Sequence, residues 1–164
     1  MIAIQTVTAE HVQLFKAVRL RALQEAPHAF GATYAYESQL TDEDWLQRTL
    51  RWNGEKGIGF LAMDGTAGCG IAGCFLDPED TKRAQLVSMW TDPAYRQQGV
   101  GRQLVNAVIG WAQQRGARTL QLLVTSNNHS ATRFYERLDF HRTGRTEPYP
   151  NDPKIVEYEM TLAI

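Results

Sequence analysis

"DPAYRQQGVGRQLVNAVIGWA", residues 92–112, joins a short polar segment to an apolar run with the period of a helix. Gly99 and Gly101 stand where this helix is predicted to begin. Backbone N–H groups at a helix start lack intrahelical partners and attract anions, and glycine lets an anion approach without meeting a Cβ atom. The segment therefore predicts a phosphate-binding turn. The alternative interpretation is a strand-to-helix turn that glycine merely eases.

Two well-known phosphate loops do not fit this segment. A dinucleotide-binding fingerprint needs a third glycine where Leu104 stands, and a P-loop needs a Gly-Lys-Ser/Thr sequence that is absent. Both are rejected, so the residues that precede the glycines must decide what kind of anion is bound.

Size and charge narrow the classes of protein. A chain of 164 residues is long enough for one ordinary domain, and we expect a single domain over residues 1–164. A net charge of -1 argues against nucleic acid and against an anionic membrane surface as partners. With neither a leader-like start nor an apolar run of about 20 residues, a cytoplasmic location is expected. The sequence leaves a homodimer open.

The two cysteines give no evidence of a disulfide or a metal site. Cys69 and Cys74 lie five positions apart in one predicted strand, so their side chains are expected on opposite faces. No second cysteine pair or close histidine cluster completes a zinc site, and no metal is expected.

Periodicity and turn signals predict a mixed α/β (α+β) chain with the order β-α-α-β-β-β-α-β-α-β-β. Thr41 is expected to cap the second helix, Asp64-Gly65 to form a hairpin turn, and Gly116 to end the helix over residues 98–115. The expected strands cover 2–7, two pieces within 57–76 on either side of Asp64-Gly65, 84–92, 118–126, 140–145 and 155–162. The expected helices cover 8–26, 98–115 and 128–138, with another that starts at Thr41 and includes Leu50.

Two motifs carry a resemblance to a known family. Residues 96–101, "RQQGVG", resemble the Arg/Gln-x-x-Gly-x-Gly/Ala loop with which the GNAT family of N-acetyltransferases grips the diphosphate of coenzyme A. Residues 128–140, "NHSATRFYERLDF", are similar to the family's N-x-x-A-x-x-x-Y-x-x-x-G-F helix. Asp139 replaces the usual glycine, but aspartate tolerates the left-handed conformation that this turn needs. Gln97 replaces a frequent glycine, and Thr91 a usual aliphatic residue.

The resemblance implies a fold and a cofactor. The fold is a GNAT-like, mostly antiparallel sheet of about seven strands flanked by about four helices. Acetyl-CoA would lie between the strand over 86–91 and the strand over 119–125, with Met89 and Thr91 contributing backbone groups, one of them an N–H for the oxyanion. Gly101→Val is expected to weaken CoA binding far more than it destabilises the fold. The cofactor-binding residues implied are Met89, Thr91, Arg96, Gln97, Gln98, Gly99, Val100, Gly101, Arg102, Asn128 and Tyr135.

The implied activity is an acetyl-CoA-dependent N-acetyltransferase, in which a primary amine of a small molecule or protein attacks directly in a ternary complex. Tyr135 would protonate the departing thiolate, since a phenol of pKa about 10 needs no large shift for this, whereas packing is its alternative role. Glu37 is the candidate base, and a solvated surface glutamate is the alternative. Phe30, Tyr34 and Tyr149 would line the acceptor site, with aromatic packing as the alternative.

Two further functions stay open at this point. One is a non-catalytic acyl-CoA-binding or sensor module with the same fold, which Tyr135 disfavours. The other is a nucleic-acid-binding protein that uses Arg96 and Arg102, which the net charge disfavours.

Overall fold

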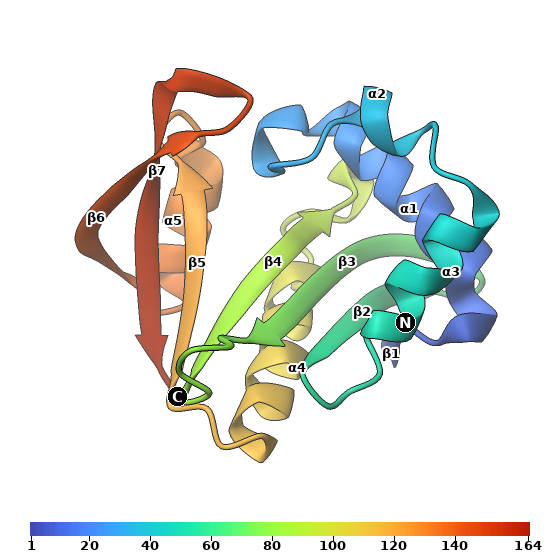
Figure 1. The fold of residues 1–164 in the computed structure, drawn as a ribbon, viewed down its shortest axis with the longest axis horizontal. Coiled ribbons are helices and arrows are strands. Elements are labelled where there is room, and N and C mark those ends of the chain that lie inside the picture. Colours follow the sequence, from blue (N-terminus) through green and yellow to red (C-terminus); the bar gives the residue numbers. More distant parts are fainter.

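Seven strands form one sheet, in the order β1-β2-β3-β4-β5-β7-β6, in the computed structural model, which describes residues 1–164 (Figure 1). All neighbouring strands are antiparallel except β4 and β5. The strands are β1 (Ile2–Thr6), β2 (Gly57–Asp64), β3 (Ala67–Leu76), β4 (Arg83–Thr91), β5 (Thr119–Thr125), β6 (His141–Tyr149) and β7 (Asp152–Ala163). The expected mixed, mostly antiparallel fold is confirmed.

Helices cover both faces of the sheet (Figure 1). The helix α4 and the shorter α5 lie on one face, above a core of 21 buried residues, and α1 and α3 lie on the other, above a core of 12. The one-turn helix α2 was not expected. The helices are α1 (Val12–Glu25), α2 (Tyr34–Glu37), α3 (Asp42–Arg51), α4 (Val100–Gln114) and α5 (His129–Arg137), with short 3₁₀ turns η1 (Ala9–His11), η2 (Pro27–Ala29) and η3 (Pro93–Tyr95).

The predicted turn and cap residues hold their places. The Thr41 side chain accepts from the N–H of Asp44 at 3.1 Å, which caps α3. Gly65, Gly116 and Asp139 have φ values of 61°, 86° and 69°, so each supplies the left-handed conformation that its turn requires. The aspartate at the exit of α5 therefore preserves the turn, as expected.

Two strand predictions are corrected. β6 and β7 extend well beyond residues 140–145 and 155–162 and meet in a tight turn after Tyr149. Eight of the nine residues of β6 are exposed, and an edge strand open to solvent on both faces carries no alternation of polar and apolar residues to reveal its length.

The expectation that the cysteines face opposite ways is also wrong. Cys69 and Cys74 belong to the same buried core, because the register of β2 and β3 shifts between Ala62 and Met63. A bulge at this point adds one residue and reverses the side-chain alternation. Both thiols are free and buried.

Glycines on two strands make room for Trp52, which follows α3. Gly59 of β2 and Gly73 of β3 are directly opposite each other, and an ideal Cβ on Gly59 would lie 1.8 Å from Trp52 Cε3. One on Gly73 would lie 3.0 Å from Trp52 Cζ2. The other side of the indole packs edge-on against Phe15 of α1 at 5.1 Å between ring centroids. The glycine pair thus fixes how closely the helices approach the sheet.

No helix has the length and apolar character needed to cross a lipid bilayer.

We expect Gly59→Ala to destabilise the protein by about 1–3 kcal/mol or more, because the new methyl group overlaps the indole of Trp52. Gly110→Ala is the matched control. An added Cβ at Gly110 meets nothing within 4 Å, and alanine in a helix interior is favoured by up to about 1 kcal/mol. Thermal and urea unfolding measure both changes. Equal stability of the two variants would show that Trp52 does not limit this contact.

Candidate active site

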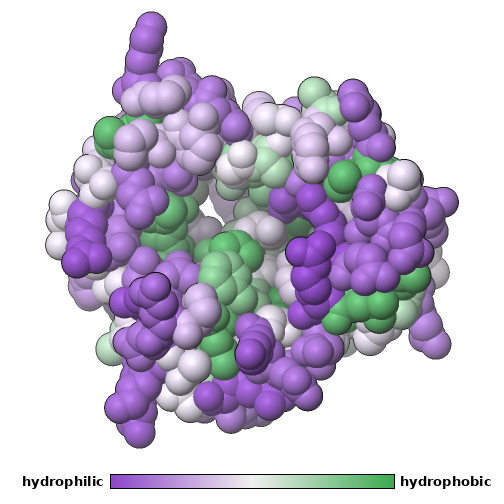
Figure 2. All heavy atoms as spheres, in the orientation of Figure 1, coloured by the Kyte–Doolittle hydropathy of each residue, from purple (hydrophilic) through white to green (hydrophobic).

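β4 parts from β5 after a short parallel ladder. Only Arg83–Gln85 of β4 pair with Thr119–Gln121 of β5, and beyond them the two strands diverge (Figure 1). The register of β4 on β3 shifts at this point, and Ser88 has a φ of 57°. A left-handed conformation costs a non-glycine residue about 1–2 kcal/mol, so the surrounding structure must hold it. The molecular surface is hollowed between the two strands (Figure 2).

The bulge at Ser88 reverses the alternation of side chains between the two faces of β4. Leu86 and Trp90 are four positions apart and would share a face in a regular strand, yet they belong to opposite cores. The β4 backbone beyond Gln85 has no strand partner on the side of β5. An extended ligand could pair with this free edge as an added strand.

The polar segment before α4 comes shortly after the end of β4, the strand that borders this hollow. The backbone N–H groups of residues 97–102 form no hydrogen bond within the protein. Gln97 and Gly99 both have positive φ, 65° and 84°, and no atom lies within 4 Å of the ideal Cβ position of Gly99. Successive N–H groups in such a turn at a helix N-terminus form an anion-binding concavity. The segment fits a diphosphate.

The side chains of this segment mostly turn back onto the protein. Arg96 donates to the carbonyl of Thr91 at 3.0 Å, and Gln98 donates to the carbonyl of Ala94 at 2.9 Å. Val100 is buried in the core. The backbone is therefore the part of these residues that a ligand would meet. Arg102, in the first turn of α4, is exposed and forms no ion pair within the chain.

Gly101 also lies close to side chains of α5 and β4. Its ideal Cβ would lie 3.0 Å from Phe134 Cζ and 3.3 Å from Met89 Cε. The missing side chain allows α4 to pack against α5 and β4, so Gly101→Val is expected to strain this packing as well, and its larger effect on CoA binding stays a prediction. Gly99, with its left-handed φ and open surroundings, is the glycine that the turn itself requires.

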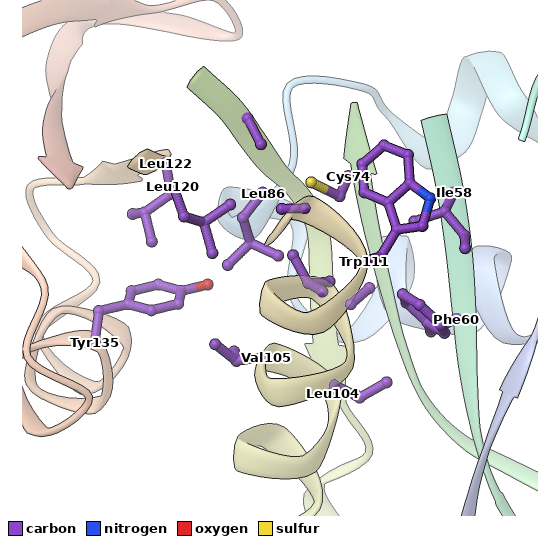
Figure 3. Close-up of a cluster of buried hydrophobic side chains, with 14 of the residues drawn as sticks. Ile58, Phe60, Cys74, Leu86, Leu104, Val105, Trp111, Leu120, Leu122 and Tyr135 are labelled. Carbon is purple, nitrogen blue, oxygen red and sulfur yellow. The ribbon is translucent and has the colours of Figure 1, made fainter. Parts of the chain in front are cut away.

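Tyr135 of α5 projects toward the same gap. Its hydroxyl is directed toward Leu86 of β4 and toward Leu120 and Leu122 of β5 (Figure 3). It forms no hydrogen bond within the protein, and burial raises the pKa of Tyr135 well above that of an ordinary phenol. The expectation of an unshifted pKa is therefore wrong. Asn128 caps α5 by accepting from the N–H of Ala131 at 3.2 Å.

Glu37 is neither exposed nor free. Its side chain is 1% exposed and accepts two hydrogen bonds from Arg19, at 3.0 and 3.1 Å, and one contact from Arg48 at 2.9 Å. Burial acts to raise the pKa of Glu37, but the hydrogen bonds and charges of the two arginines outweigh it and lower the pKa. A carboxylate with a lowered pKa is a weak base, so this geometry does not favour Glu37 as the base.

The three predicted acceptor-site aromatics lie on the segment between α1 and α3 and on the β6–β7 hairpin. Tyr149, at the hairpin tip, is buried, and its hydroxyl donates to the carbonyl of Phe30 at 2.6 Å. Phe30 is buried under the guanidinium of Arg19, at 4.7 Å. Tyr34 is 39% exposed. Tyr34 is thus the most accessible of the three, and a contact of any of them with an acceptor stays a prediction.

Comparison of the sequence with known protein families identifies the family. A model of the acetyltransferase (GNAT) family matches residues 19–140, which include the diverging strands β4 and β5, the loop before α4 and Tyr135. The chain belongs to the GNAT family of acetyltransferases. The expected enzyme class, an N-acetyltransferase with acetyl-CoA as donor, is confirmed.

Individual GNAT relatives resemble the chain in sequence or in fold. The [ribosomal protein bS18]-alanine N-acetyltransferase of Escherichia coli (strain K12) is 34% identical over 123 residues, which are 73% of this chain and 80% of that protein. PaiA N-acetyltransferase from Thermoplasma acidophilum, solved in complex with coenzyme A, aligns with a TM-score of 0.79 at 14% identity, over 100% of this chain and 99% of that one. The yncA protein of Salmonella typhimurium, solved with acetyl-CoA, gives 0.80 at 15%, over 99% and 94%. These two structures share the fold.

A second carboxylate with a raised pKa gave no signal in the sequence. Glu157 of β7 is paired with Thr125, the last residue of β5, and with Glu147 of β6. Burial and then the charge of Glu147 raise the pKa of Glu157. Strand alternation alone does not distinguish such a residue from any other outward-facing glutamate. No group of three or more His, Cys, Asp or Glu side chains is arranged to hold a metal ion.

We expect Glu37→Gln to lower stability at neutral pH by roughly 3–5 kcal/mol, since it leaves two arginines without their buried partner. The folded pKa of Glu37 is lowered, so its stabilisation is complete above the unfolded value near 4.5 and is lost as the pH falls through the folded value. Unfolding curves at neutral pH and below pH 4.5 should show the difference from wild type shrinking in acid.

Glu55→Gln serves as the control, because Glu55 is exposed and forms no ion pair. If the Glu37 and Glu55 variants are equally stable at neutral pH, the buried cluster contributes nothing that the ion pairs explain.

Proposed function

We propose that this GNAT protein transfers an acetyl group to the α-amine at the N-terminus of a protein, by direct attack of the amine in a ternary complex. The observation that carries this proposal is the run of unpartnered N–H groups at residues 97–102, which opens beside the gap between β4 and β5. Tyr135 aims its hydroxyl toward the same gap (Figure 3). An anion cradle and a proton donor thus border one hollow.

The residues of the chain divide the work between them. The backbone of residues 97–102 and the first turn of α4 would hold the diphosphate, and Arg102 adds a positive charge there. The free edge of β4 at Met89 and Thr91 would orient the arm of the cofactor. When bound, acetyl-CoA supplies an activated thioester. Tyr135 carries its proton at neutral pH and would give it to the departing sulfur, although burial raises the pKa of Tyr135 and makes it a weaker acid than an ordinary phenol.

Direct transfer is supported by the state of both thiols. Burial raises the pKa of Cys74 to about 12, and burial followed by the charges of Asp64 and Asp92 raises the pKa of Cys69. A thiolate is the nucleophilic form of cysteine, so neither residue is suited to carry the acetyl group. An acetyl-cysteine route is therefore disfavoured.

The acceptor is proposed from the curated relative together with the site. The E. coli relative is named for acetylating an alanine of ribosomal protein bS18, and a protein N-terminus is one of the amines that the sequence leaves open. An alkylamine is almost wholly protonated at neutral pH, so a base helps its attack. Glu157 of β7, opposite Thr125 at the end of β5 and with a raised pKa, meets this requirement better than Glu37. A cytoplasmic location accords with a ribosomal acceptor, and a homodimer stays a prediction.

The proposed function predicts selective binding and a defined product. Calorimetry should show that CoA and acetyl-CoA bind and that NAD and ATP do not, because the loop lacks the marks of their fingerprints. With acetyl-CoA present, thiol release should require a peptide with a free N-terminus, and mass spectrometry should place the acetyl group there. The same peptide with a blocked N-terminus is the control. Turnover with spermidine or free amino acids, but with no peptide, would overturn the acceptor class and keep the enzyme.

Tyr135→Phe keeps the ring packing and removes only the proton donor. We expect acetyl-CoA affinity to stay within a few-fold while turnover falls about 10²-fold, the usual scale for one general acid. Tyr95→Phe is the control, since its hydroxyl donates to Asp64 at 2.8 Å outside the gap. Wild-type turnover in the Tyr135 variant across the pH range would identify Tyr135 as a packing residue.

A further inference from the structure

Ser88 is the one residue with a positive φ inside a strand that is not glycine. Gln97 and Asp139, the other two non-glycine residues with positive φ, lie in turns. The Ser88 conformation is unfavourable for a side-chain-bearing residue, and no sharp turn of the chain requires it here. Something must hold β4 in this shape at the point where it leaves β5.

One buried side chain reaches Ser88 from a helix. Arg19 of α1 donates from Nη1 to Ser88 Oγ at 2.8 Å, while its Nε and Nη2 donate to the two carboxylate oxygens of Glu37. Arg19 is 8% exposed and Glu37 is 1% exposed. Because the guanidinium is planar, the two bonds to Glu37 fix the direction of the remaining N–H toward Ser88. Arg48 of α3 holds the carboxylate from another side.

The same guanidinium connects β4 to the opposite wall of the hollow. Arg19 lies over the ring of Phe30, whose carbonyl accepts from the hydroxyl of Tyr149 at the tip of the β6–β7 hairpin. Glu37 belongs to α2, on the segment that links α1 to α3. The cluster of Arg19, Glu37, Arg48 and Ser88 thus joins three helices to the strand at its bulge.

We propose that Arg19 and Glu37 are positioning residues, which hold the Ser88 bulge and so place the free β4 edge at Met89–Thr91 where the acetyl donor binds. The inference rests on the proposed function for its catalytic consequence, and its structural part concerns the free protein. Arg19 meets Ser88 and Glu37, and neither it nor Glu37 is assigned a contact with substrate. Their action is on the shape of the strand.

The structural part is tested without any ligand. Ser88→Ala removes the hydroxyl and keeps the backbone, and Arg19→Lys keeps the charge but loses the planar fork. Hydrogen exchange of the β4 amides should become faster at residues 86–91 in both variants, and no faster in β1 and β2. Asp77→Asn is the matched control, because it breaks an ion pair with Arg83 at the other end of β4. Unchanged exchange at 86–91 in the folded Ser88 and Arg19 variants overturns the proposal.

The catalytic part is tested by separating kcat from KM. We expect kcat to fall about ten- to a hundredfold in each variant, since small misplacement of a reacting group has effects of this size, while the acetyl-CoA dissociation constant changes less. The double variant should be no worse than the poorer single variant, because both remove one contact. Asp77→Asn should keep the wild-type kcat.

Each failure has its own signature. Faster exchange in β4 with a wild-type kcat, or additive losses in the double variant, overturns the positioning role while the enzyme stands. A wild-type protein that neither binds acetyl-CoA nor acetylates a peptide overturns the proposed function, and with it the catalytic consequence. The exchange result still shows whether the cluster holds the bulge.

Discussion

The early end of the β4–β5 ladder is the constraint on which the site depends. In the middle of a sheet, two neighbouring strands normally satisfy each other's backbone, and here that pairing stops at Gln85 and Gln121. At the open end the segment around η2 is bonded to the β5 side of the gap, where Thr125 donates to the carbonyl of His28 and Tyr149 to that of Phe30. The sheet is thus joined at one end of the gap and clasped at the other. A ligand between them finds unpaired backbone inside a rigid frame.

The position of α4 follows from the same parallel pair. A parallel connection needs a crossover, and α4 supplies it, so its N-terminus lies just after the end of β4. The backbone N–H groups at the start of α4 have no partner within the helix. They therefore lie beside the gap simply because α4 begins there. The close approach of α4 to α5, which Gly101 permits, brings Tyr135 to the other side of that gap. The anion-binding turn and the hydroxyl border one hollow because α4 follows β4 directly and α5 packs against α4.

The sequence predicts the elements that are marked by hydrophobic periodicity or by turn and cap residues. It misses the features that depend on contacts between residues far apart in the chain. Gly99, Gly116 and Asp139 are residue types that tolerate a positive φ at helix ends, and each was predictable. Ser88 carries no such mark, because serine is an ordinary strand residue until Arg19, 69 positions away, holds it in a bulge. Glu37 reads as a surface glutamate until two arginines bury it. The shift that brings Cys69 and Cys74 to one face is likewise a property of strand pairing, which one strand alone does not reveal.

The buried cluster is better understood as a means of shaping the strand than as a source of stability. Two guanidinium groups and one carboxylate leave an excess positive charge, and removing ions from water costs several kcal/mol each before their attraction returns part of it. A protein with apolar side chains of similar size at these positions would often be at least as stable. Apolar side chains, however, cannot form a directional hydrogen bond with a strand. An arginine whose fork is fixed by a carboxylate gives one N–H a definite direction, and that N–H meets the only strand residue in a left-handed conformation that is not glycine. The buried arginine therefore lies where a directed hydrogen bond is needed, at the bulge from which β4 diverges from β5 and the gap begins.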